Sequence, residues 1–392
     1  MKRLGWILVL LVATSPAWAA KKMTVEQLQT LLQSLQGAKK TDADVADELK
    51  QVELTEELTG STMDSLASYI PGTLSTQQLY LLEARSAVLA PPAADLPQTP
   101  APDAAAQKAL LDKALDYAAR TYAQLPHLTA TKTTFRFQDS LKPPDRADPG
   151  KVPDKVWRDA RMGSGSQFIY YIGSSETKVE SRNGAEIVSN VKDPTRWGAN
   201  GQIVLLGPGP ALSAIVQDAQ AAGKLNWLRW ETVNGRQTAV FSFAVEKKKS
   251  HYTVNYCCFP DTDSTGATGN RGIGGIASTG RGTLQTNTNW SPHRETAPYH
   301  GEIFVDSGTG IIVRLVLLAE FKPSNVIHQE DTRIDYGPAK VADKPLVVPV
   351  RTFINTEVAP NGEDSANQFS TRRTVFTLEY KDYQLADASA QQ

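Results

Sequence analysis

Two apolar runs joined by a short polar turn form the most informative stretch of this 392-residue chain: Tyr299-His300-Gly301-Glu302-Ile303-Phe304-Val305-Asp306, then Thr309-Gly310-Ile311-Ile312-Val313-Arg314-Leu315. The connection from Asp306 to Gly310 has the length and composition of a hairpin loop, which joins antiparallel neighbours. We therefore expect strands at Gly301–Val305 and Ile311–Phe321 to pair with each other.

Strand patterns extend from this hairpin in both directions. From Leu128 onward apolar and polar side chains alternate, which is the period of a strand with one buried face. Asn183-Gly184 and Asn234-Gly235 are two-residue turn signals whose backbone twist suits antiparallel hairpins. These patterns predict an α+β fold with an antiparallel sheet, whose further strands we place at Gln167–Ile172, Thr177–Ser181, Glu186–Val188, Gln202–Leu206, Trp227–Val233, Gln237–Val245, His251–Tyr256, Thr332–Tyr336, Val348–Val358 and Gln368–Tyr380.

Helical patterns precede and interrupt the predicted sheet. Residues 20–90 contain short amphipathic segments, the first introduced by a capping box at Thr24, and predict a small helical region. The Pro- and Ala-rich residues 91–103 are typical of an extended linker. A longer amphipathic helix follows at Ala104–Leu125, and another helix is expected at Ala211–Ala221.

The predicted strands carry large apolar side chains on both faces. Such a sheet needs a covering layer on each side, and the helix at Ala104–Leu125 can cover only one of them. Ordinary core packing and a ligand cavity are both compatible with this apolar surplus. The candidate ligand-binding side chains of the concave sheet face are Trp227, Trp230, Phe241, Phe243, Ile303, Val305 and Ile312.

Composition and the N-terminal residues indicate the compartment. The 41 Lys and Arg residues against 42 Asp and Glu leave no charge excess to attract nucleic acid. Residues 1–19 have the form of a secretory signal peptide, because Lys2 and Arg3 precede an apolar run and Ala17 and Ala19 suit cleavage. No later run reaches the roughly 20 apolar residues of a membrane-spanning helix. We therefore expect a periplasmic or secreted protein that is not integral to the membrane.

The only two cysteines, Cys257 and Cys258, are adjacent and cannot tie distant segments together. Free thiols and a strained vicinal disulfide both remain open for them, so packing must stabilise the fold. Residues 259–298 are rich in Gly, Ser, Thr and Asn and predict a long flexible surface loop in the domain at 104–385. A disordered tail is expected at 386–392.

Three patterns offer catalytic or metal-binding chemistry, but none has the context it needs. Asp261-Thr262-Asp263-Ser264-Thr265 matches a phosphatase nucleophile motif, which requires the end of a parallel strand. The same residues resemble half of a calcium loop, but Gly272 stands where a closing Glu is needed. The spacing of His293, Glu295 and His300 matches no zinc pattern. We therefore predict no catalytic residues, no metal and no cofactor.

The order of signal peptide, amphipathic helix and antiparallel meander with an inserted helix resembles the periplasmic lipoprotein-carrier superfamily (LolA-like proteins). The hairpin is similar to that family's pattern, in which Asp306 ends one strand, Thr309-Gly310 form the turn and Arg314 lies on the next strand. The resemblance covers about residues 104–385. It implies an open antiparallel β half-barrel wrapped on an amphipathic helix, with a concave apolar face that receives acyl chains or lipoprotein-derived signals. The helical region at 20–90 and the 259–298 loop are not family features.

Three functions follow from these observations, in descending order. The first is an exported, soluble, non-catalytic protein that binds a hydrophobic or lipid-like ligand on the concave sheet face. The second is a structural or interaction protein of the cell envelope, whose N-terminal helices bind another envelope protein. The third and most remote is a metal-dependent hydrolase that uses His293, Glu295 and His300.

Overall fold

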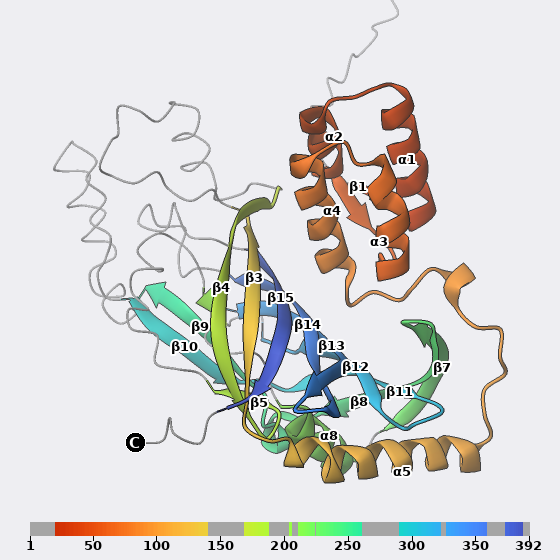
Figure 1. The fold of residues 1–392 in the computed structure, drawn as a ribbon, viewed down its shortest axis with the longest axis vertical. Coiled ribbons are helices and arrows are strands. Elements are labelled where there is room, and N and C mark those ends of the chain that lie inside the picture. The colour runs from red at the N-terminus through yellow and green to blue at the C-terminus, as the bar shows by residue number, and fades with distance from the viewer. Residues whose placement is uncertain are drawn as a thin grey trace, which may run out of the picture.

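The computed structural model describes residues 20–139, 168–187, 204–205, 211–223, 225–260, 290–322, 327–358 and 373–386. Its largest element is a ten-stranded sheet in which all neighbouring strands run antiparallel (Figure 1). The strand order is β5-β4-β3-β15-β14-β13-β12-β11-β8-β7, so the sheet is open and has β5 and β7 at its edges. The fold is therefore α+β, as predicted.

The strands of this sheet make up most of the described residues after position 127. Their bounds are β3 Leu128–Gln138, β4 Tyr170–Arg182, β5 Ala185–Ile187, β7 Asn226–Val233, β8 Arg236–Val245, β11 Tyr299–Asp306, β12 Ile312–Ala319, β13 Ile327–Val341, β14 Lys344–Val358 and β15 Arg373–Leu385. A three-stranded antiparallel sheet contains β6 Val204–Leu205, β9 Thr253–Pro260 and β10 Trp290–Thr296. A parallel pair near the N-terminus contains β1 Lys21–Met23 and β2 Val52–Leu54.

The hairpin predicted at 299–315 is present as β11 and β12. Asp306 Oδ1 accepts hydrogen bonds from the backbone N and the Oγ1 of Thr309, both at 2.7 Å, and thereby closes the turn. Gly310 has a φ of 78°, which few residues other than glycine adopt. The register shifts beside Phe304, and this bulge leaves Ile312 on the same face as Ile303.

The helices of the N-terminal region are α1 Val25–Gly37, α2 Asp42–Leu49, α3 Gly60–Leu66 and α4 Thr73–Ser86. The predicted capping box at Thr24 is present, and Thr41 forms a second one at α2. Helix α4 begins at Thr73, where Asp42 accepts hydrogen bonds from the backbone N of Leu74 and Ser75, a cap supplied from another helix.

Two further helices lie beneath the large sheet in Figure 1, α5 Ala104–Arg120 and α8 Leu212–Ala222. Asp103 caps α5 through the backbone N of Ala106. A left-handed glycine, Gly223, ends α8. Both helices were expected from their apolar spacing.

Two strand predictions differ from the structure. The predicted strands Gln167–Ile172 and Thr177–Ser181 are parts of the single strand β4, which bends at Gly173 opposite a register shift in β3. Strand β10 lies within the predicted loop at 259–298. It pairs with β9, and its register shift falls between Ser291 and His293, where a proline removes a backbone donor. The predicted signal peptide, residues 261–289 and most of the predicted tail lie outside the described residues.

The large sheet has two buried faces. We call the face that carries Phe241, Ile303 and Leu315 the inner face, and the face that carries Val240, Phe304 and Val316 the outer face. Helices α5 and α8 cover the inner face. Helix α4 contacts β14 and β15 on the outer face, where Leu81, Ala84 and Ala87 are buried. No helix among the described residues has the length and apolar character needed to cross a membrane.

Candidate functional site

The seven predicted ligand-binding side chains lie in one apolar cluster on the inner face. Five of them are at most 3% exposed, and the two tryptophans are partly buried against the others. Trp227 contacts both Trp230 and Phe241 edge-on, with ring centroids 4.8 and 5.7 Å apart. The sequence therefore located a coherent surface, which in this conformation is packed against helices.

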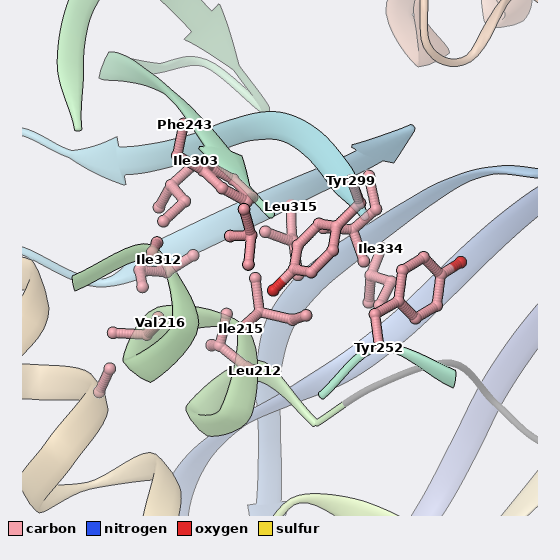
Figure 2. Packing of buried hydrophobic residues seen from close by; sticks show 14 of the residues in the cluster. Leu212, Ile215, Val216, Phe243, Tyr252, Tyr299, Ile303, Ile312, Leu315 and Ile334 are labelled. Carbon is pink, nitrogen blue, oxygen red and sulfur yellow. The ribbon is translucent and has the colours of Figure 1, made fainter. Parts of the chain in front are cut away.

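Helix α8 fills much of the space in front of the inner face. Figure 2 shows Leu212, Ile215 and Val216 of this helix pointing toward Ile303 and Leu315 of the sheet. Ile215 is fully buried, and Leu212 and Val216 are at most 3% exposed. Small side chains of α5, including Ala114 and Ala118, complete the cover. The sequence predicts one covering helix, Ala104–Leu125, whereas two helices cover the inner face, α5 and α8.

A buried carboxylate attaches α8 to the sheet. Asp218, 1% exposed, accepts hydrogen bonds from the backbone N of His251 at 2.8 Å and the hydroxyl of Tyr299 at 2.8 Å. Its other oxygen lies 2.5 Å from Nδ1 of His251. Burial and the bond to Asp218 raise the pKa of Tyr299, so this hydroxyl stays protonated and acts as a donor. These contacts hold the polar side of α8 while its apolar side packs on the sheet.

A small cavity of about 50 Å³ remains at the end of the inner face, beside β3, β4 and β15. Four tyrosines line it together with Leu212 and Ile334: Tyr122, Tyr336, Tyr380 and Tyr383. Burial raises the pKa of all four, so they present neutral hydroxyls. The cavity has room for one or two water molecules of about 30 Å³ each, so a long apolar ligand requires the helices to move.

The outer face carries a stripe of buried charges that the sequence analysis did not identify. Arg314 and Arg333 both donate to Asp335, at 2.7 and 2.8 Å, and both donate to Glu57 of the N-terminal region, at 3.2 and 2.5 Å. Burial alone would raise the pKa of Asp335. The two guanidinium groups outweigh burial and hold it well below its usual range.

The N-terminal region is attached to the outer face at a second point. Arg351 donates two hydrogen bonds to Glu83 of α4, at 2.5 and 2.8 Å. Around this pair Leu81 and Ala84 pack on Phe353 and Val375. The second covering layer that the apolar strands require is therefore supplied by residues 55–90.

The residues of the remote metal hypothesis have other partners. His300 Nδ1 lies 2.9 Å from Glu320, and Glu295 accepts a hydrogen bond from Lys247. The side chain of His293 lies outside the described residues. Within the described part of the chain, no three His, Cys, Asp or Glu side chains are grouped to bind a metal ion.

With this geometry the chain belongs to the class of α+β proteins that have an open antiparallel sheet with helices on both faces. No family model and no curated protein matches the sequence. The structure is similar to a domain from Vibrio parahaemolyticus described as an outer membrane lipoprotein-sorting protein domain, with a TM-score of 0.31 and 9% identity. The match covers 73% of this chain and 95% of that chain.

Proposed function

We propose that this chain is an exported binding protein that holds a hydrophobic or lipid-like ligand between the inner face and helices α5 and α8. The observation that carries the proposal is the inner face itself. It is continuous and apolar, it extends over several strands, and its cover includes a short helix that one buried carboxylate attaches. The proposal needs no catalytic group, and it includes the periplasmic or secreted location.

The ligand class follows from the free energy of burial that α8 loses when it leaves the sheet. Exposing Leu212, Ile215 and Val216 costs about 6 kcal/mol, at about 2 kcal/mol for each side chain. An acyl chain recovers about 0.8 kcal/mol for each methylene that it buries, so about eight methylenes balance the loss. We therefore expect acyl chains of ten or more carbons to bind and shorter chains to bind poorly.

A dansyl-labelled undecanoic acid tests this proposal directly. On binding, its emission should shift to the blue, and tryptophan excitation should transfer energy to the dansyl group. Trp227→Phe and Trp230→Phe should each reduce this transfer, because both tryptophan side chains pack in the apolar cluster of the inner face. Palmitate should displace the probe. The absence of a blue shift at micromolar protein, or unchanged transfer in both variants, would contradict the proposal.

The envelope-interaction alternative needs a different test from deletion of residues 20–90. That deletion would leave Arg314, Arg333 and Arg351 without Glu57 and Glu83, so it would damage the fold as well as any partner surface. Helix α4 has two exposed apolar side chains, Leu74 and Tyr80, at 50% and 43% exposure. If Leu74→Ser and Tyr80→Ser abolish binding of an envelope partner while binding of the dansyl probe is unchanged, this alternative is favoured.

A further inference from the structure

A second cavity, of about 310 Å³, lies on the outer side of the molecule, away from the inner face. The β7–β8 hairpin forms one wall, with Glu231 and Asn234. The start of α3 and the residues after α4 form the opposite wall, with Thr59 and Asp95. Glu57 and Arg314 of the buried charge stripe also line it. This volume lies at the lower end of the range for small-molecule sites.

The charges that line this cavity are unequal. Three carboxylates, Glu57, Asp95 and Glu231, face one guanidinium group, that of Arg314. Arg229 and Arg333 lie behind the wall and bind Glu231 and Glu57, but they also bind Glu302 and Asp335. With these four groups included, five carboxylates still face three guanidinium groups. The cavity wall therefore has an excess of negative charge.

Glu231 is the wall carboxylate at which the arginines leave one oxygen without a hydrogen bond. Its side chain is 3% exposed, and Oε2 accepts two hydrogen bonds from Arg229, at 2.9 and 2.7 Å. Oε1 instead lies 3.6 Å from Nη1 of Arg314, which is too long for a hydrogen bond. Burial and the nearby Glu57 raise the pKa of Glu231, against the effect of the arginines. At the cavity wall, Oε1 therefore has an ion-pair contact to Arg314 but no hydrogen bond from the described residues.

The rest of the wall suits a small polar molecule. Thr59, Ser61 and Asn234 offer hydroxyl and amide groups, and Asp95 is exposed at the opening. An ammonium group brings its own hydrogen-bond donors, so it can bond to a carboxylate and to these hydroxyl and amide oxygens together.

We propose that this cavity binds the ammonium group of a small organic amine, with Glu231 Oε1 as its inner acceptor and Asp95 at the opening. The ammonium group supplies the donor that Oε1 lacks and balances the excess charge. This site is separate from the inner face and does not depend on the lipid-binding proposal.

Isothermal titration of the full-length protein with 1,4-diaminobutane tests the site, with 1,4-butanediol as the uncharged control. Glu231→Gln keeps the shape of the wall and removes its charge. Glu302→Gln is the matched control, because Glu302 also binds Arg229 but does not line the cavity. We expect the diamine to bind and the diol not to bind. Affinity should fall at least tenfold in Glu231→Gln and change less than threefold in Glu302→Gln.

Two further experiments identify the source of the amine and control for misfolding of the variant. Dihexanoyl phosphatidylethanolamine is compared with dihexanoyl phosphatidylcholine, whose quaternary group donates no hydrogen bond. If the ethanolamine lipid binds, Glu231→Gln weakens that binding and the diamine does not bind, the ammonium site is supported and the amine belongs to a lipid headgroup. If circular dichroism shows that Glu231→Gln is unfolded, Asp95→Asn at the exposed opening should weaken binding about threefold. The proposal would be overturned if neither amine binds, or if the diol binds as tightly as the diamine. Equal losses of affinity in Glu302→Gln and Glu231→Gln would also overturn it, as would unchanged affinity in Asp95→Asn.

Discussion

Replacing Asp218 with alanine should release helix α8 from the inner face. The substitution removes the acceptor of the bonds from His251 and leaves the buried hydroxyl of Tyr299 without its partner. A hydrogen bond to a charged group contributes about 1.5–3 kcal/mol, and a buried unsatisfied hydroxyl costs about 1–3 kcal/mol. Allowing for the water that replaces these contacts, we expect the closed position of α8 to lose about 3 kcal/mol, which is roughly a 100-fold change in population.

Hydrogen exchange measured by mass spectrometry reports this change directly. Amides of Leu212–Ala222 should exchange about 100-fold faster in Asp218→Ala, while those of α1 should be unaffected. Asp116→Ala on α5 is the control, because its ion pair with Arg120 is exposed and it should alter exchange less than threefold.

Ligand affinity is linked to the same equilibrium. If ligand binds only when α8 is displaced, the apparent dissociation constant is the intrinsic one divided by the fraction of displaced protein. Asp218→Ala should therefore tighten binding of the dansyl probe by a factor similar to the gain in α8 exchange. Faster α8 exchange with unchanged probe affinity would refute the idea that α8 controls access. Unchanged α8 exchange would refute the role assigned to Asp218.

Three further outcomes test the structural account. Gly301→Ala should destabilise the fold by about 3 kcal/mol in urea titration, because a Cβ there would lie 1.9 Å from the carbonyl oxygen of Val316, whereas Gly308→Ala should be tolerated. Glu57→Gln should cost about 3 kcal/mol by leaving the buried arginines short of a negative charge, with Lys22→Ala as a near-neutral surface control. The lowered pKa of Asp335 means that it adds stability above its unfolded pKa of about 3.9 and that this stability is lost as the pH falls below that value. The urea midpoint of the wild type should therefore drop between pH 5 and pH 3 more steeply than that of Asp335→Asn, and parallel curves would contradict the assignment.

Local patterns in the sequence were sufficient for the elements that local forces determine. The hairpin at 299–315 depends on an Asp that closes its own turn and a glycine with positive φ, and both are visible in the sequence. The capping box at Thr24 and the stripe on α5 are local in the same way. The apolar strands also predicted a sheet that needs cover on both faces, and both faces are buried in the structure.

Contacts between distant residues could not be predicted. Glu57 binds Arg314 and Arg333, which lie 257 and 276 positions away in the sequence. No pattern in the sequence around Glu57 predicts a buried ion pair. A partial signal was present on the other side, because Arg314 interrupts an apolar strand and must find a partner if it is buried. The tyrosines around the small cavity come from the turn that follows α5 and from distant strands, so only the folded sheet brings them together.

Native mass spectrometry of the mature protein, purified without detergent from the cells that export it, tests the proposed function most directly. We predict a population that carries one acyl-chain ligand, and we predict that bare protein takes up palmitate at a one-to-one ratio. Recovery of the bare chain alone, with no uptake of acyl chains of any length, would contradict the proposal and leave the inner face as an ordinary packed core.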